Sequence, residues 1–150
     1  MRTDEASPVS FRPAADGDAA GIAALLTDLG YATDPGDVPA RIARFTAHGA
    51  GTVLIAEAAG RVAALAALEY TQPIHHSRPV AHVSAFVVGS AHRRRGLGRR
   101  LLTEVERLAA AAGCPRIVVT SAEHRADAHA FYVRAGWNYN GRRFARELTR

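Results

Sequence analysis

The sequence has no lysine, only one cysteine and no long apolar run. A lone Cys114 excludes an internal disulfide and a metal cluster built from cysteines. The most apolar stretch, residues 62–68, is too short to span a bilayer. The first residues include acids and no hydrophobic signal segment. We therefore expect a cytoplasmic protein without a signal peptide or a membrane anchor.

The charge balance is basic, with 19 arginines against 14 acidic residues and a net charge of +5. A basic excess indicates an acidic partner, which is a nucleic acid, an anionic membrane or a phosphorylated small molecule. The absence of lysine carries no functional information, because arginine can replace it through GC-rich codon usage. The 150 residues, of which 48% are hydrophobic, predict one domain, residues 1–150, with one sizeable core.

Glycine and proline divide the chain into alternating elements of a mixed α/β sheet. The expected helices are one capped by Asp16 and ended by Gly30, and three at 38–47, 97–112 and 126–134. The expected strands are 9–12, 52–58, 61–70, 80–88, 116–121, 137–139 and 144–148. We expect the second and third of these strands to form a hairpin, because only Ala59 and Gly60 separate them, although the alanine-rich composition of residues 61–70 leaves a helix open there.

Residues 87–102 combine a strand, a turn with glycine and the start of a long amphipathic helix. The first N–H groups of a helix have no partner within the helix and lie at the positive end of its dipole, so this arrangement suits a phosphate. Gly96 and Gly98 permit close approach to the backbone, and five arginines add positive charge. The segment is neither a Walker loop nor a dinucleotide fingerprint. The alternatives are a solvated basic helix start and a nucleic-acid surface, and the latter is disfavoured because residues 93–100 include no aromatic.

Two motifs resemble those of the GNAT superfamily of acetyl-coenzyme A-dependent N-acetyltransferases. Arg93-x-x-Gly96-x-Gly98 after a strand is similar to motif A of that family. Phe131-Tyr132 followed by Gly136-Trp137 is similar to motif B, with tryptophan in place of phenylalanine. The resemblance extends over residues 11–148. It implies a single-domain α/β fold with a splayed mixed sheet of six to seven strands and about four helices.

The resemblance also implies a binding site for acetyl-coenzyme A. Backbone groups of Phe86, Val87 and Val88 would hold the pantetheine arm, and those of the turn and helix start would hold the pyrophosphate. The implied cofactor-binding residues of the second group are Arg93, Arg94, Arg95, Gly96, Leu97, Gly98 and Arg99. Arg125 stands at the position where many members of the family carry a cofactor-contacting asparagine, and the resemblance therefore implies it as a further cofactor-binding residue.

Acetyl transfer from a thioester to an amine needs an acid for the leaving thiolate and a base for the ammonium. Tyr132 matches the family's general acid, and the alternative is a core aromatic of its helix. Candidates for the base are His82 and Glu69, followed by Glu123 and His124. An imidazole titrates near neutrality, which favours His82. The alternative for each is a solvated strand end.

The loop at residues 73–78 carries the adjacent histidines His75 and His76. We expect no metal, because adjacent histidines point apart in an extended chain and no carboxylate or cysteine lies at ligand spacing, although the imidazoles leave a metal requirement open. This loop and residues 125–132 also resemble aminoalkylphosphonate N-acetyltransferases. That resemblance indicates a small primary amine with an anionic group that Arg78 or Arg125 could hold.

The sequence therefore predicts an N-acetyltransferase that transfers acetyl to the primary amine of a small molecule, by direct attack in a ternary complex. Cys114 beside Pro115 gives no reason for a covalent intermediate. The alternatives are a protein or peptide N-acetyltransferase of the same fold and, more distantly, a nucleic-acid-binding module. We expect neither a nucleic-acid nor a membrane partner, and a homodimer stays open.

Overall fold

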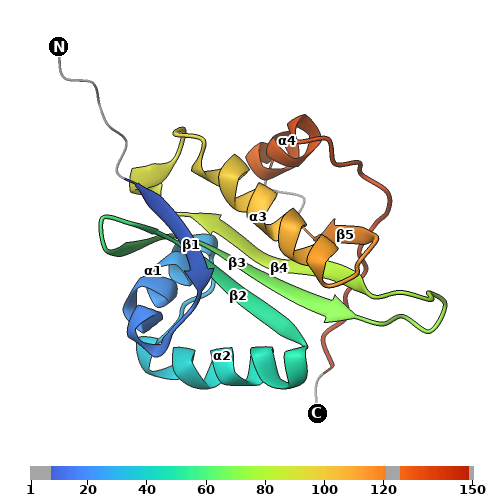
Figure 1. Ribbon diagram of the computed structural model, residues 1–150, viewed down its shortest axis with the longest axis horizontal. Coiled ribbons are helices and arrows are strands. Elements are labelled where there is room, and N and C mark those ends of the chain that lie inside the picture. Colours follow the sequence, from blue (N-terminus) through green and yellow to red (C-terminus); the bar gives the residue numbers. More distant parts are fainter. Residues whose placement is uncertain (1–7, 121–125, 149–150) are drawn as a thin grey trace. The chain divides into compact units, whose positions relative to one another are not determined.

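The computed structural model describes residues 8–120 and 126–148 (Figure 1). The strands are β1 (Val9–Pro13), β2 (Gly51–Ala58), β3 (Arg61–Thr71), β4 (Val80–Val88) and β5 (Arg116–Val119). The α-helices are α1 (Ala19–Leu29), α2 (Val38–Thr46), α3 (Leu97–Ala111) and α4 (Ala126–Arg134). The chain forms two compact units, Met1–Val118 and Val119–Arg150. The expectation of one domain over residues 1–150 stays a prediction.

The strands form one five-stranded sheet in the order β1-β2-β3-β4-β5. The pairs β1–β2, β2–β3 and β3–β4 are antiparallel. The predicted hairpin between β2 and β3 is confirmed, and both turn residues have left-handed backbone angles, with φ of 51° at Ala59 and 74° at Gly60. Two such residues give the twist that matches paired strands. The two-residue turn brings Arg61 of β3 opposite Ala58 of β2.

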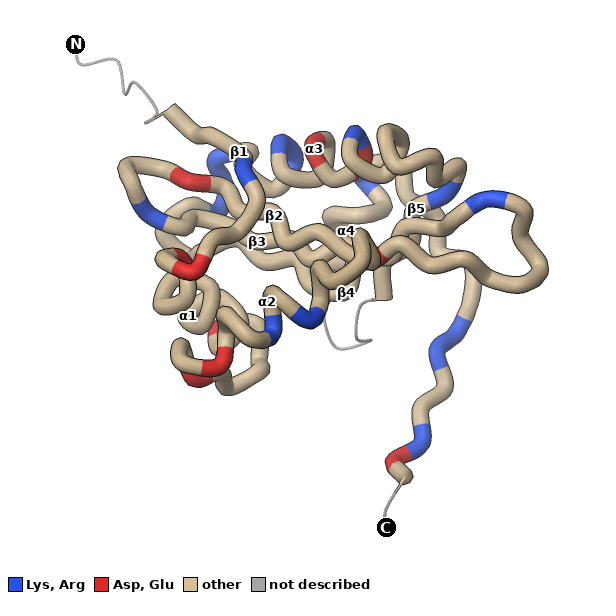
Figure 2. The backbone as a smooth tube through the Cα atoms, turned by 60° about the horizontal axis from the view of Figure 1, so that its bottom comes forward, with Lys and Arg blue, Asp and Glu red and all other residues tan. Residues whose placement is uncertain are grey.

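Helices cover both faces of β2–β4 (Figure 2). α1 and α2 pack on one face, where Ile22, Leu25 and Val38 meet Ile55 and Leu65 in a buried cluster. α3 packs on the other face of the sheet and buries its apolar stripe, which comprises Leu97, Leu101, Leu102, Val105 and Ala109. Because both faces of these strands are packed against helices, the strands hold the segments that follow them in place.

The start of α1 differs from the expected one. Asp16 begins a short 3-10 turn, Asp16–Asp18, and the α-helix follows Asp18. The carboxylate of Asp18 is buried and accepts hydrogen bonds from Arg12 Nη1 at 2.8 Å and from the Ala15 N–H at 2.8 Å. The bond from Arg12 holds the pKa of Asp18 below its usual range. The backbone and guanidinium partners therefore make Asp18, not Asp16, the residue that organises this helix start. The end at Gly30 is as predicted, with φ of 113°.

The expected strands at 137–139 and 144–148 are wrong, because no strand follows β5 among the described residues. Tyr139, Phe144 and Leu148 are exposed, at 78%, 89% and 89%. Alternating apolar residues stabilise a strand only when it has a hydrogen-bonded neighbour and a surface to pack against. The sheet consequently has five strands instead of six to seven. No helix in residues 8–120 and 126–148 has the length and apolar character to cross a membrane.

Candidate active site

A bulge interrupts β4 near its middle. Ala67 of β3 pairs with Ala85, but the next residue, Leu68, pairs with Val83, so Ser84 has no partner on β3. An extra residue of this kind bends the strand and increases its twist. The bulge thus changes the direction of residues 85–88, the part of β4 that precedes the predicted phosphate-binding turn.

A second bulge, in β3, lies beside the end of β4. Ala56 of β2 pairs with Ala64 and Glu57 with Val62, so Ala63 of β3 is the extra residue. The Ala63 carbonyl accepts a hydrogen bond from the Gly89 N–H at 2.8 Å. A Cβ atom at position 89 would lie 3.0 Å from that oxygen, so a side chain there would crowd the bond. Gly89 was not among the predicted site residues, although a glycine directly after a strand is a recognisable signal of close backbone approach.

The turn between β4 and α3 has an unusual backbone. A 3-10 turn, Ser90–His92, is followed by Arg94 with φ of 61° and Gly96 with φ of 77°. The left-handed region costs a non-glycine residue about 1 kcal/mol, so Arg94 stores strain. At the head of the turn, Arg93 Nε donates a hydrogen bond to the Val88 carbonyl at 3.1 Å. This bond joins the turn to the last residue of β4, and it was not predicted from the sequence.

No acidic residue of the preceding turn, residues 89–96, or of the first turn of α3 balances the N-terminus of this helix. Its N-cap is Gly96, no side chain caps it, and its first turn contains no acid. By contrast, α1 follows Asp18 and α2 follows Asp37. The first-turn N–H groups of a helix and the positive end of its dipole attract anions. No described side chain caps these N–H groups, and a phosphate group would bind to them.

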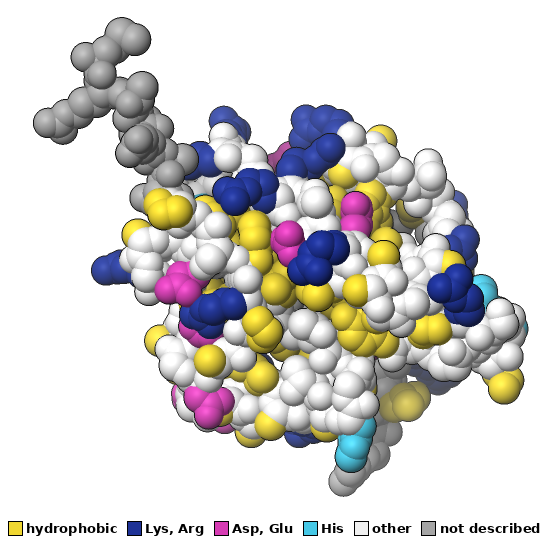
Figure 3. Space-filling model, in the orientation of Figure 1, with side chains coloured by type: hydrophobic (Ala, Val, Ile, Leu, Met, Phe, Trp, Pro, Cys, Tyr) yellow, Lys and Arg dark blue, Asp and Glu magenta, His cyan; other side chains and the backbone are white. Residues whose placement is uncertain are grey.

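Arginine side chains surround this helix start instead of acids. Arg93, Arg94, Arg95, Arg99 and Arg100 are all exposed, and basic side chains gather over the turn and the first half of α3 (Figure 3). Leu97 is buried, so only its backbone is available to a ligand. The structure therefore brings the predicted residues Arg93 to Arg99 together around one unneutralised helix start. Arg125, with Glu123 and His124, lies outside the described residues.

Glu69 and His82, both candidate bases, lie directly opposite each other on β3 and β4. Directly opposed residues of paired strands point to the same face of a sheet. Leu65 lies four residues before Glu69 on β3, so both side chains point to the same face, and Leu65 belongs to the core that α1 and α2 cover. Glu69 and His82 therefore lie on the α1 and α2 face. Both side chains are half-buried. Glu69 forms no side-chain hydrogen bond or ion pair within the described part of the chain. The two candidates thus form one site, with an available carboxylate beside an imidazole.

On β2, the strand on the other side of β3 from β4, the residue opposite Glu69 is a glycine. Gly51 of β2 pairs with Glu69, and a Cβ atom at position 51 would lie 2.6 Å from the ring of Phe45. The Phe45 ring consequently sits over the sheet beside Glu69. An aromatic ring and a carboxylate on neighbouring positions suit an amine in its ammonium form.

Tyr132 belongs to the second unit, on α4. Its ring centroid lies 5.3 Å from that of Phe131 and 5.4 Å from that of Trp137. The Trp137 N–H donates to the Tyr132 carbonyl at 2.9 Å, which folds the residue after Gly136 back against the helix end. Burial raises the pKa of Tyr132 to about 12. Its phenol therefore stays protonated throughout the physiological range.

One side chain and one backbone hydrogen bond hold the histidine loop between β3 and β4. The side-chain amide of Gln72 donates from Nε2 to the His76 carbonyl at 2.7 Å, and the His76 N–H donates to the Pro73 carbonyl at 3.1 Å. The two histidine rings lie 4.5 Å apart. In the described residues, no three of His, Cys, Asp and Glu form a group able to hold a metal. The expectation that no metal takes part stays a prediction.

The comparisons with known proteins assign the class. The sequence profile of the Acetyltransferase (GNAT) family matches residues 19–137, and the chain belongs to that family. It is therefore an acetyltransferase, an enzyme of the acyltransferase class. Among curated proteins, none matches the sequence. The resemblance to aminoalkylphosphonate acetyltransferases stays a prediction.

Solved structures share the mixed α/β fold. A putative acetyltransferase from Agrobacterium tumefaciens is 26% identical, with a TM-score of 0.82 over 93% of this chain and 99% of that one. A glucosamine-6-phosphate N-acetyltransferase from Arabidopsis thaliana is 17% identical, with a TM-score of 0.82 over 95% and 99%. An aminoglycoside N-acetyltransferase in complex with coenzyme A is 16% identical, with a TM-score of 0.84 over 98% and 99%.

Proposed function

We propose that this enzyme transfers the acetyl group of acetyl-coenzyme A to the primary amine of a small molecule, by direct attack in a ternary complex. The observation that carries the proposal is the start of α3, which has no side-chain cap, no acid in its first turn and five arginines around it. Coenzyme A carries phosphates that suit this position. Membership of the GNAT family supports acetyl-coenzyme A as the donor.

The chain's backbone would hold the donor at two places. N–H groups from Arg94 to Arg99 would bind the pyrophosphate, and backbone groups of Phe86, Val87 and Val88 would bind the pantetheine arm. The bulge at Ser84 and the bond between Gly89 and Ala63 support this division, because they set the direction of β4 and anchor its end. The end of β4 and the start of α3 are only a few residues apart along the chain. Together they would hold the thioester at a fixed position relative to the phosphates.

Two observations support a small amine as the acceptor. Solved structures with this fold include a glucosamine-6-phosphate N-acetyltransferase and aminoglycoside acetyltransferases. In this chain, Glu69 offers a half-buried carboxylate without a polar partner among the described residues, next to His82 and near the Phe45 ring. An ammonium group would be attracted to the carboxylate, and it must lose a proton before it attacks the thioester.

His82 is the proton acceptor in this proposal, and Glu69 holds the ammonium. His82→Asn should lower kcat/KM at neutral pH by about tenfold. This loss is smaller than the 10²–10⁴ typical of acid–base groups, because Glu69 beside it can accept the proton instead. Glu69→Gln should mainly raise KM for the amine. An unchanged kcat/KM in His82→Asn would remove His82 from the proton route.

The donor is tested by thermal unfolding with and without acetyl-coenzyme A. A ligand at about 100 times its Kd stabilises the folded state by about 2.7 kcal/mol, which corresponds to roughly 5–10 °C in Tm at this chain length. The acceptor is then sought by thioester loss over aminoalkylphosphonates, polyamines, arylalkylamines, aminoglycosides and a lysine peptide. No Tm shift at millimolar acetyl-coenzyme A would contradict the proposal. Turnover of the peptide alone would replace the small amine by a protein substrate.

A further inference from the structure

Ser84, the extra residue of the bulge in β4, is the polar residue of its part of the strand. Its neighbours Val83 and Ala85 are apolar, and of the three only Ser84 is exposed. Its hydroxyl forms no hydrogen bond within the described part of the chain. A serine hydroxyl can both donate and accept hydrogen bonds. Ser84 therefore has both capacities available for a bound molecule.

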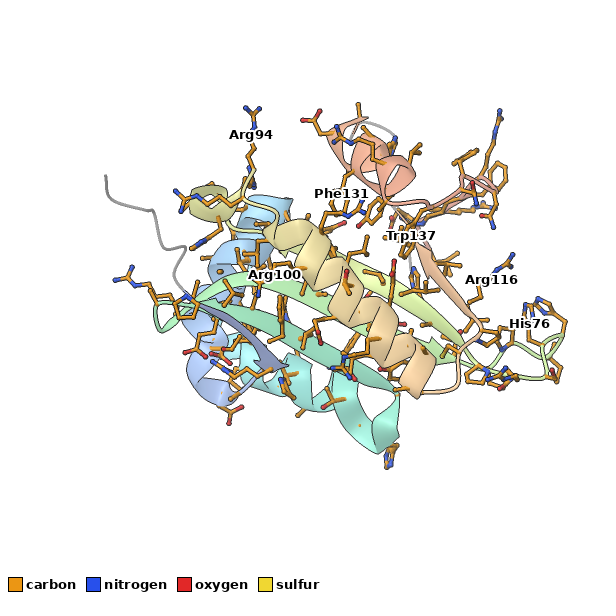
Figure 4. All side chains as sticks on the ribbon, turned by 45° about the horizontal axis from the view of Figure 1, so that its top comes forward. His76, Arg94, Arg100, Arg116, Phe131 and Trp137 are labelled. Carbon is orange, nitrogen blue, oxygen red and sulfur yellow. The ribbon has the colours of Figure 1, made fainter. Side chains whose placement is uncertain are left out.

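The pairing of β3 with β4 places Ser84 on the same face of the sheet as His82. α3 lies across the opposite face of these strands (Figure 4), where Val83 is buried. Successive residues of a strand point to opposite faces, so His82 and Ser84, on either side of Val83, share the α1 and α2 face. Ala85 pairs with Ala67 on that same face, so the bulge sets two residues of β4 against one of β3.

Ser84 lies between two parts of the site that must exchange a proton. The proposed pyrophosphate position is the turn after β4, so the pantetheine arm runs back along the strand and its reacting end is nearest to Phe86. His82, the proposed proton acceptor, is four residues further back, about 13 Å along an extended strand. Glu69 attracts the ammonium but lies opposite His82, so it does not shorten this distance. Proton transfer needs hydrogen-bond contact, at about 3 Å, so a group between Phe86 and His82 is required.

We propose that Ser84 is a further catalytic residue, whose hydroxyl passes the proton of the attacking ammonium to His82. The inference rests on the proposed function and adds a residue to it. In this step an N–H bond of the ammonium breaks and its proton bonds to Oγ, while the Oγ–H bond breaks and its proton bonds to an imidazole nitrogen. The hydroxyl is unchanged at the end. The amine keeps the electron pair with which it attacks the thioester carbon.

Ser84→Val and Ser84→Thr are the matched variants for the test. Both new side chains are β-branched and have nearly the same shape, but only threonine keeps the hydroxyl. We expect Ser84→Val to lower kcat/KM by about a hundredfold, at the lower end of the range for acid–base groups, with the loss in kcat. Ser84→Thr should retain most of the activity. Ser84→Ala should fall between them, because a water molecule can take the place of the hydroxyl.

A combined variant distinguishes a relay from an independent contribution. Ser84 precedes both His82 and Glu69 on the proton route, so its loss exceeds that of His82→Asn alone. Effects of residues that act as a unit are not additive, so adding His82→Asn to Ser84→Val should cost less than about twofold. Ser10 is an exposed serine of β1, and Ser10→Val should leave kcat/KM as it is. Circular dichroism and the Kd of acetyl-coenzyme A, measured by calorimetry, should be the same in all variants.

The outcomes separate this inference from the proposed function. Equal activity of Ser84→Val and Ser84→Thr would show that the hydroxyl carries no proton, and the inference would fail while acetyl transfer stands. If His82→Asn costs as much in the Ser84→Val background as it does alone, the two residues act on separate routes and the relay is wrong. If the unmodified enzyme neither binds acetyl-coenzyme A nor acetylates any amine, the proposed function itself is wrong.

Discussion

Tyr132→Phe is expected to lower kcat by about a hundredfold or more, within the range typical of a positioned general acid. The substitution removes only the hydroxyl group. The ring keeps its position between Phe131 and Trp137, at centroid distances of 5.3 and 5.4 Å. The reason for the loss is that coenzyme A leaves as a thiolate, which needs a proton from a nearby O–H group. The measurement is kcat under saturating acetyl-coenzyme A and amine.

The matched control for this variant is Tyr139→Phe. Tyr139 lies in the same unit and is 78% exposed, so the same chemical change there should alter kcat by less than about twofold. Acetyl-coenzyme A should raise the Tm of both variants as it does for the unmodified enzyme. Full activity in Tyr132→Phe would show that Tyr132 is only a packed aromatic of α4.

The pH dependence follows from the direction of the pKa shift. Burial raises the pKa of Tyr132 to about 12, so its proton is present at every pH in the usual assay range. Ionisation of Tyr132 should therefore produce no decline in rate between pH 7 and pH 10. A raised pKa also means that its contribution to stability is complete below the unfolded value of about 10 and is lost as the pH rises through 12. A basic limb that Tyr132→Phe abolishes near pH 8 would contradict this assignment.

Local signals were sufficient for most elements of the fold. β4 at Val80–Val88 and α4 at Ala126–Arg134 have the predicted bounds. α3 ends one residue before the predicted position, ahead of Gly113. Glycine in the left-handed region and proline act within one turn of the chain, so a single sequence is enough to place such boundaries. The start of α3 at Leu97 was also predicted, because it depends on neighbours along the chain.

Contacts between distant residues were not predictable from the same signals. Glu69 and His82 were separate candidates, and only the register of β3 and β4 makes them a pair. That register depends on the extra residue Ser84, which has no local signature. Phe144 and Leu148 show the opposite failure, because their alternation indicates a strand while both are exposed. A strand is defined by its partner, which lies outside the segment itself.

Gly96→Asp is expected to weaken acetyl-coenzyme A binding by about a hundredfold while the protein remains folded. A Cβ atom at position 96 meets nothing within 4 Å, so the side chain has room. The added carboxylate stands at the start of α3, where it takes the place of an external anion and repels the pyrophosphate by up to about 4 kcal/mol at 4 Å. The left-handed backbone, with φ of 77°, costs about 1 kcal/mol, and the favourable helix dipole offsets most of it. Calorimetry gives the Kd, and thermal unfolding gives the stability.

Gly113→Asp at the other end of α3 is the matched control. Gly113 also has a left-handed backbone, with φ of 83°, and nothing within 4 Å of a Cβ atom. The same carboxylate there meets the negative end of the helix dipole, so we expect a loss of about 1–2 kcal/mol in stability and no change in Kd. Gly96→Asn adds the same bulk without the charge and should weaken binding much less than Gly96→Asp. Equal effects of Gly96→Asp and Gly113→Asp on the Kd would mean that net charge, not the start of α3, controls binding. Equal effects of Asp and Asn at position 96 would mean that the site excludes any side chain, because the phosphates need the backbone itself.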